Sequence, residues 1–102
     1  MLTRTHPTLP ATWYYDPDQY RREMECIWWK EWLCVARTSE LPDPGYYRVV
    51  RAGTQQVIIT RTGQNELRAF HNTCRHRGSL LCEQATGQFQ GQRIVCPYHA
   101  WT

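Results

Sequence analysis

The chain has 102 residues, of which 41% are hydrophobic and 21% are charged, so its composition is that of one globular domain with a modest core. Its formal net charge is only +3 at pH 7 and its basic residues are scattered, which argues against a nucleic-acid-binding protein. No run approaches the ~20 apolar residues of a membrane span, so we expect no membrane partner.

The front of the chain predicts an extended arm and then one helix. Residues 1–15 show no periodicity and form the arm. Asp16 is typical of a helix N-cap, and Pro17 suits the first helical position. Apolar side chains then recur at helical spacing and define one face: Tyr20, Met24, Ile27 and Trp28. We expect the helix to end near residue 32 and a short strand to follow at Leu33–Arg37.

The second part of the chain has the pattern of a β structure. The segment Leu41–Gly45 combines proline, aspartate and glycine, which is typical of a turn. Three β-rich runs follow, at Tyr46–Val50, Gln56–Arg61 and Leu67–His71. Residues 62–65 have turn chemistry, so the last two runs are predicted to form a hairpin. We expect a loop at residues 72–82 and a further short strand at Arg93–Val95.

The cysteine content indicates a reducing compartment. Five cysteines cannot all pair in a secreted disulfide framework. No apolar signal segment opens the chain, because charged residues and prolines interrupt it: Arg4, His6, Pro7 and Pro10. We therefore expect a cytoplasmic protein, in which neighbouring Cys and His residues bind metal more often than they form disulfides.

Two short motifs carry the chemistry. The first is Cys74-Arg75-His76 and the second is Cys96-Pro97-Tyr98-His99, with 19 residues between His76 and Cys96. Each motif offers one thiolate and one imidazole, in the same order. Four such side chains in two matched pairs predict a metal centre.

The alternation of the ligands favours a two-iron cluster over zinc. A tetrahedral zinc site can use two Cys and two His, but zinc fingers group the two Cys first and the two His later. In a [2Fe–2S] cluster with mixed ligands, two Cys hold one iron and two His hold the other. Loops that each carry one Cys and one His suit that arrangement, because each loop reaches both irons.

The remaining Cys and His residues are interpreted as structural. Cys82 lies near the first motif but has no matching partner, so we expect a small buried side chain. Cys26 and Cys34 are predicted to pack within and after the helix. His71 precedes the first motif at the end of a strand; it is a spare-ligand candidate, although its position favours support of the loop.

The motifs resemble those of a known family. Residues 74–78 and 96–101 are similar to the Rieske motif of ring-hydroxylating non-haem iron oxygenase large subunits. Three further segments resemble that family's N-terminal region: Ile27–Trp32, Pro44–Tyr47 and Ala69–Asn72. The resemblance spans nearly the whole chain, and its two loop motifs are highly specific.

The resemblance implies a ligand set and a subtype. Cys74 and Cys96 would ligate the inner iron of a Rieske [2Fe–2S] cluster, and the more exposed outer iron would be held by His76 and His99. Respiratory-type Rieske proteins carry an extra disulfide between the two loops. Ser79 and Tyr98 stand at the matching positions here, which favours the oxygenase and ferredoxin branches.

The resemblance also implies the fold and the role. The fold class is mainly β with an N-terminal helix, as a Rieske-type antiparallel β-sandwich. Residues 1–40 would form the arm and the Trp-rich helix, and residues 41–102 the Rieske domain. Since the sequence ends three residues after His99, we expect this domain to be incomplete at its C-terminus and the chain to be the front piece of a longer protein.

In the resembled mono- and dioxygenases, the Rieske cluster takes electrons from a reductase or ferredoxin. It passes them to a mononuclear iron in a later catalytic domain, where a 2-His-1-carboxylate site activates O₂. This chain would supply the electron-transfer domain of such an enzyme, which we expect to be a homo-oligomer. The front region is similar both to oxygenases of aromatic rings and to oxygenases of quaternary ammonium compounds.

Two other functions remain open from the sequence. A stand-alone Rieske ferredoxin would have about this length, although its first ligand would be expected earlier than residue 74. A zinc-stabilised interaction module would use the same four side chains. Visible absorbance and acid-labile sulfide distinguish both iron–sulfur proteins from the zinc module.

Overall fold

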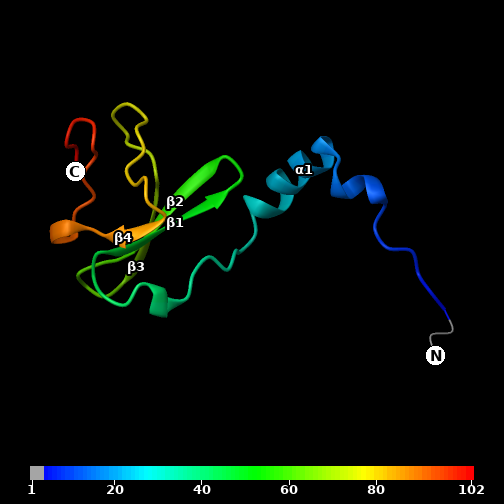
Figure 1. Cartoon of the computed structure of the whole chain (residues 1–102), viewed down its shortest axis with the longest axis horizontal. Coiled ribbons are helices and arrows are strands. Elements are labelled where there is room, and N and C mark those ends of the chain that lie inside the picture. Colours follow the sequence, from blue (N-terminus) through cyan, green and yellow to red (C-terminus); the bar gives the residue numbers. More distant parts are fainter. Residues whose placement is uncertain (1–3) are drawn as a thin grey trace. The chain divides into compact units, whose positions relative to one another are not determined.

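The computed structural model describes residues 4–102, which separate into two compact units (Figure 1). The first unit ends at Leu33 and contains the helical segments. The second unit, residues 34–102, contains the sheet and both Cys/His motifs. None of the helices among the described residues is both long and apolar enough to cross a membrane.

The first unit consists of three short helical segments: the 3₁₀ helix η1 (Ala11–Tyr14), the α-helix α1 (Pro17–Glu23) and the π-helical turn η2 (Met24–Trp28). The predicted start is confirmed, since Asp16 Oδ1 accepts the backbone N–H of Asp18 at 2.9 Å and Pro17 is the first helical residue. The helical path ends at residue 28 rather than 32. The part of the arm at η1 is helical rather than extended; the arm residues 1–3 lie outside the described residues.

The predicted apolar face of this helix is mostly exposed. Met24 is buried, at 6% exposure, whereas the Tyr20, Ile27 and Trp28 side chains are 46–58% exposed. Helical spacing places these side chains on one face, but it does not bury them.

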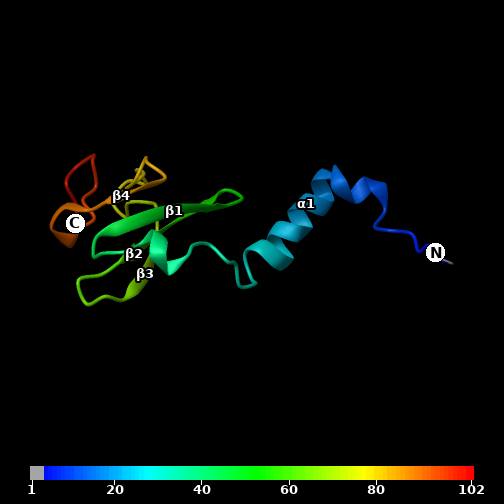
Figure 2. The same ribbon diagram turned by 60° about the horizontal axis from the view of Figure 1, so that its bottom comes forward.

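The second unit is built on one four-stranded antiparallel sheet with the strand order β3-β2-β1-β4 (Figure 2). Its strands are β1 (Tyr46–Ala52), β2 (Gln55–Arg61), β3 (Leu67–His71) and β4 (Thr86–Gln88). β1 and β2 form a two-residue hairpin, because Ala52 pairs with Gln55. β2 and β3 form the second hairpin, in which Ile58 pairs with Phe70. The first three strands are therefore confirmed, each within one or two residues of its predicted bounds.

The buried face of the sheet is small. Ile58 is fully buried and Thr60, two residues further along β2, is 6% exposed, as the period of two requires for side chains on one face. The Thr60 hydroxyl donates to the backbone oxygen of Tyr46 at 2.9 Å, so this buried polar group is satisfied. Leu41, at 1% exposure, adds the other large apolar side chain.

Two predicted strands are wrong and one was missed. Leu33–Arg37 is irregular and leads into the 3₁₀ turn η3 (Thr38–Glu40). Arg93–Val95 forms no strand in the described residues, and it follows the 3₁₀ turn η4 (Gln90–Gln92). A β-rich run becomes a strand only if another strand offers it hydrogen bonds.

The missed strand β4 is short and has glycine at its centre, so its composition did not indicate a strand. Gly87 pairs with Tyr47 on β1, and a Cβ at Gly87 would lie 2.7 Å from the tyrosine ring. The tyrosine ring occupies the space that a side chain at position 87 would take. The mainly β, antiparallel fold class is confirmed; of the expected sandwich, the described residues form one sheet.

Candidate metal centre

The two Cys/His motifs lie in neighbouring loops that project from the same side of the second unit, as the yellow and the orange-to-red segments in Figures 1 and 2. The first loop follows β3 and the second follows η4. The ring centroids of His76 and His99 are 4.9 Å apart, so the loop tips are in contact. Two residues that lie 23 positions apart in the sequence are thereby brought together.

The two loops share one backbone pattern. In the first, the Cys74 N–H donates to the Ser79 oxygen at 2.8 Å and the Gly78 N–H donates to the Cys74 oxygen at 2.9 Å. In the second loop, the Cys96 N–H donates to the Trp101 oxygen at 2.7 Å and the Ala100 N–H donates to the Cys96 oxygen at 3.0 Å. Each loop is therefore a tight turn that begins at its cysteine.

The two thiols form the buried part of the site. Cys74 is 7% and Cys96 is 3% exposed, and the two thiols are within hydrogen-bonding reach of each other. The pKa of the Cys96 thiol lies below its ordinary value, first because the backbone N–H of Tyr98 donates to the sulfur. The Cys74 thiol, the His99 N–H and the Ser79 hydroxyl lower this pKa further, while burial opposes them. The loops therefore favour a thiolate, which is the metal-binding form of cysteine.

The two imidazoles form the exposed part of the site. Both His76 and His99 lie on the surface. The Trp101 ring stacks on His76 with a centroid distance of 4.6 Å and an interplanar angle of 3°. The Tyr98 ring packs on His99 at 3.8 Å and is itself 60% exposed. Tyr98 thus reaches the ligand sulfur through its backbone N–H, while its side chain contacts the neighbouring imidazole.

The donor set fits two metal ions that each take one pair of ligands. Buried thiols meet as one pair and exposed imidazoles meet as another. A tetrahedral zinc ion takes all four side chains around one point, whereas a mixed-ligand [2Fe–2S] cluster takes two Cys on one iron and two His on the other. The pairing of thiol with thiol and of imidazole with imidazole matches the second arrangement.

The other cysteines lie apart from these pairs. Cys82 is buried, at 6% exposure, and its sulfur is hydrogen-bonded to the Tyr47 hydroxyl. Burial raises the pKa of the Cys82 thiol, which keeps it neutral and unreactive. Cys26 and Cys34 are both exposed, so the prediction that they pack is wrong. His71 is exposed at the end of β3.

The sequence interpretation missed two residues of the site. Ser79 stands where respiratory-type Rieske proteins have a cysteine, and no role was predicted for its side chain. It belongs to the first loop, and its hydroxyl is hydrogen-bonded to the Cys96 sulfur of the second loop. Asn72 belongs to the segment Ala69–Asn72 that resembles the family's N-terminal region, but no role was predicted for it. It is fully buried at the base of the first loop. Spacing arguments could not find them, because their partners are decided by how the loops close.

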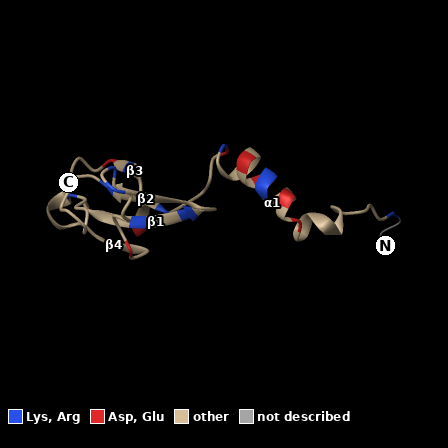
Figure 3. Ribbon diagram, turned by 90° about the horizontal axis from the view of Figure 1, so that it is seen from above, with Lys and Arg blue, Asp and Glu red and all other residues tan. Residues whose placement is uncertain are grey.

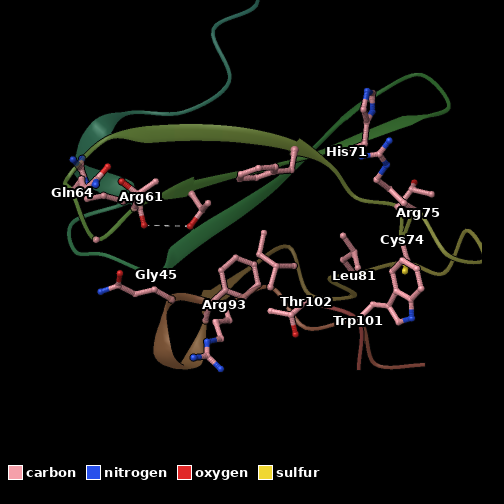
Figure 4. A pocket seen from close by; sticks show the side chains of 18 residues that line it. Gly45, Arg61, Gln64, His71, Cys74, Arg75, Leu81, Arg93, Trp101 and Thr102 are labelled. Atoms are coloured by element: carbon pink, nitrogen blue, oxygen red, sulfur yellow. Dashed lines mark hydrogen bonds between the residues drawn. The ribbon is translucent and has the colours of Figure 1, made fainter. Parts of the chain in front are cut away.

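A cavity of about 1140 Å³ lies beside the first loop, within the second unit (Figure 4). Arg61 and Gln64 line one end, and Cys74 and Trp101 line the other. Phe70, 46% exposed, also lines it. The sheet face next to the site is therefore open in this chain.

Comparison with known proteins agrees with this geometry. Residues 31–102 match the family described as the Rieske [2Fe-2S] domain. The glycine betaine monooxygenase oxygenase subunit of Chromohalobacter salexigens is 46% identical over 95 residues, which are 93% of this chain and 21% of that protein.

Two solved structures have the same fold. A quaternary ammonium Rieske monooxygenase, described in terms of carnitine oxidation and inter-subunit electron transfer, is 38% identical with a TM-score of 0.83. The alignment covers 90% of this chain and 25% of that one. Naphthalene 1,2-dioxygenase from Rhodococcus sp. is 36% identical with a TM-score of 0.82, over 90% of this chain and 20% of that one.

The chain spans only about a fifth to a quarter of the length of these relatives. The family match nevertheless covers most of its residues, including both loops and the whole sheet. The chain belongs to the Rieske [2Fe–2S] domain family.

Proposed function

We propose that Cys74 and Cys96 ligate one iron of a Rieske [2Fe–2S] cluster and that His76 and His99 ligate the other. The observation that carries this proposal is the pairing of like ligands across two loops of the same backbone pattern. The buried thiols place one end of the site inside the unit. The exposed imidazoles place the other end at the surface, where a redox partner can approach.

When bound, such a cluster exchanges one electron at roughly −150 to +300 mV, against about −400 mV for all-cysteine plant-type clusters. The residues of this chain support that role in distinct ways. The N–H groups of Tyr98 and His99 donate to the Cys96 sulfur and stabilise its anionic form. The Trp101 ring stacks on one face of His76, which holds the imidazole plane in place.

We further propose that this chain is the electron-transfer domain of a Rieske non-haem iron oxygenase. It would accept electrons from a reductase or ferredoxin and pass them to a mononuclear iron that activates O₂, in a catalytic domain outside this chain. The support is the identity of 36–46% to oxygenase subunits of several kinds. The whole enzyme would be a cytoplasmic homo-oligomer, and one relative is described by inter-subunit electron transfer.

The experiment that tests the ligand set compares cysteine variants of the chain after reconstitution with iron and sulfide. The wild-type chain should show visible absorbance and two irons with two acid-labile sulfides. Cys74→Ser and Cys96→Ser should each lose the cluster, because each removes a thiolate from the same iron. Cys82→Ser is the matched control, since Cys82 is equally buried but bonded to Tyr47, and it should keep the cluster.

Two results would contradict the proposal. A wild-type chain that binds zinc without colour or sulfide would establish the zinc module instead. Loss of the cluster in Cys82→Ser, with retention in Cys96→Ser, would overturn the ligand assignment. A stand-alone ferredoxin is distinguished by the gene: a downstream catalytic domain with two His and one carboxylate ligand supports the oxygenase.

A further inference from the structure

Asn72 lies between the sheet and the first loop. It directly follows β3, and its backbone N–H donates to the Gln56 oxygen on β2 at 2.9 Å, which extends the strand pairing by one residue. Its side chain is 0% exposed. A buried carboxamide is costly unless its two donors and two acceptor sites are filled.

All four positions of this carboxamide are filled. Nδ2 donates to Gln56 Oε1 at 3.0 Å and to the Cys82 backbone oxygen at 2.8 Å. Oδ1 accepts the backbone N–H of Leu81 at 3.1 Å and that of Cys82 at 2.8 Å. Three of the four bonds therefore join Asn72 to backbone groups 9 or 10 residues further along the chain.

These bonds close the first loop at its base. The turn that carries His76 is closed inside the same loop, by the backbone bonds between Cys74 and Ser79 and between Gly78 and Cys74. The loop thus has an inner closure made by its own backbone and an outer closure made by one side chain. The outer closure is anchored to the sheet through Gln56.

The second loop has the inner closure alone. It shows the same two backbone bonds at Cys96 and Ala100. The Asn and Gln side-chain hydrogen bonds of the described residues are all made outside residues 94–102. The two loops therefore differ in how their cysteines are attached to the sheet. The loop that carries Cys74 is closed at its base by a side chain, Asn72, in addition to its own backbone bonds.

We infer that Asn72 is a positioning residue that holds the first cluster-binding loop closed and thereby sets where Cys74 and His76 meet the second loop. This inference rests on the proposed ligand set. Asn72 is not itself a ligand, because its carboxamide is fully used by Gln56, Leu81 and Cys82. Its effect on the cluster is transmitted through the loop backbone.

The competing explanation is that Asn72 is only a satisfied polar group of the core, and Thr60 provides the matched control for it. Thr60 is also buried, and its hydroxyl also donates to a backbone oxygen, but of Tyr46 within the sheet. Thr60→Val should lower the stability of the sheet and leave the loop closed. Asn72→Ala should open the loop.

The first experiment measures the reconstituted chain in these two variants. Asn72→Ala should lose its cluster to a chelator about 10- to 100-fold faster than the wild type, as for other residues that orient metal ligands. The EPR g-values of its reduced cluster should also shift. Thr60→Val should lower the melting temperature while its g-values and loss rate stay at the wild-type values. Equal behaviour of the two variants would overturn the inference.

The second experiment needs neither a variant nor the cluster. In the wild-type chain without iron, the amides of Leu81 and Cys82 should exchange with solvent at least about tenfold more slowly than those of residues 75–77, as expected for hydrogen-bonded buried amides. Exchange of Leu81 and Cys82 at the rate of residues 75–77 would overturn the closure. Failure of the wild-type chain to take up iron and sulfide would contradict the ligand set alone.

Discussion

Gly78 and Ala100 occupy equivalent positions in the two loops. Each lies four residues after a proposed cysteine ligand and donates its N–H to that cysteine's backbone oxygen, at 2.9 and 3.0 Å. Both have left-handed backbone conformations, with φ of +72° and +57°. Glycine adopts this region freely, whereas a residue with a Cβ does so at a cost. The same turn is thus built once with the favoured residue and once without it.

The first prediction concerns this pair. A Cβ added at Gly78 would meet nothing within 4 Å, so Gly78→Ala should cost about 1 kcal/mol through backbone strain alone. Ala100→Gly should change stability by less than about 0.5 kcal/mol, because relief of strain is offset by the greater freedom of the unfolded chain. Ala100→Val should cost about 2 kcal/mol, since a β-branched residue suits this region least. Denaturant unfolding measures all three, and equal effects of Ala100→Gly and Ala100→Val would contradict the shared turn.

The second prediction concerns the ring that covers His76. Trp101→Ala removes a parallel stack at 4.6 Å but leaves the backbone oxygen that accepts the Cys96 N–H. Loss of an aromatic contact of about 0.5–1.5 kcal/mol should speed chelator-driven loss of cluster absorbance by about two- to tenfold. Trp101→Phe, which keeps an aromatic face, is the control and should stay near the wild-type rate. An unchanged rate in Trp101→Ala would show that the stack does not protect the site.

The third prediction concerns Arg61, which joins three parts of the second unit. Its guanidinium donates to three backbone oxygens. The acceptors are Leu41, Thr38 at 3.3 Å and Asn65 at 3.2 Å. Arg61→Ala should therefore cost about 2–3 kcal/mol of unfolding free energy. Arg61→Lys should recover less than half of this loss, because one ammonium group cannot reach all of these oxygens.

Arg51 provides the control for this prediction. It is exposed on β1 and forms no ion pair among the described residues, so Arg51→Ala should change stability by less than about 0.5 kcal/mol. Thermal and denaturant unfolding of both alanine variants give the comparison. Similar losses in the two would mean that the bonds of Arg61 contribute no net stability.

The fourth prediction concerns pH. The backbone N–H of Arg37 donates to Glu40 at 2.7 Å and lowers the pKa of this carboxyl below its ordinary value of 4.5, with a further contribution from the Arg48 guanidinium. A lowered pKa in the folded state means stability that is present above pH 4.5 and is lost as the pH falls through the folded value. Glu40→Gln should therefore flatten the acid limb of the stability curve.

The matched control for this pH effect is Glu83→Gln, since Glu83 is exposed and forms no ion pair among the described residues. Its acid limb should follow that of the wild type. Melting temperatures measured from pH 6 down to about pH 3 span the titration of an ordinary carboxyl. A wild-type slope in Glu40→Gln would show that the folded pKa of Glu40 is not lowered.

The second unit carries a net positive charge. Residues 34–102 contain eight Arg and four acidic residues, and blue predominates over red there in Figure 3. Arg75 and Arg77 flank His76 in the first loop, and both are exposed. A negatively charged surface would be attracted to this side of the unit. Such attraction weakens as ionic strength rises.

Local sequence determined the features that depend on neighbouring residues. The cap at Asp16, the three strands β1, β2 and β3 and the β2–β3 hairpin with its turn at 62–65 follow from short-range preferences, because each is built within a few residues. The two Cys/His motifs and the family also follow from the sequence, since their spacing is specific. These features could be predicted because no distant partner is needed to form them.

Tertiary structure decided the features that depend on distant partners. β4 exists because Gly87 leaves room for the Tyr47 ring, 40 residues earlier in the chain. The Leu33–Arg37 and Arg93–Val95 segments have strand-like sequences but find no pairing edge among the described residues. Strand formation is thus a property of two segments together, and one segment read alone predicts it poorly.

The same distinction applies within the site. Residue types and spacing indicated four ligands, because thiolates and imidazoles in alternating pairs suit two irons. Only the folded loops show that thiol meets thiol in the interior and imidazole meets imidazole at the surface. Only they show that Asn72 closes the first loop, since its hydrogen bonds form after the chain has returned to it 10 residues later. The sequence determined which groups are available, and chain closure decided which of them meet.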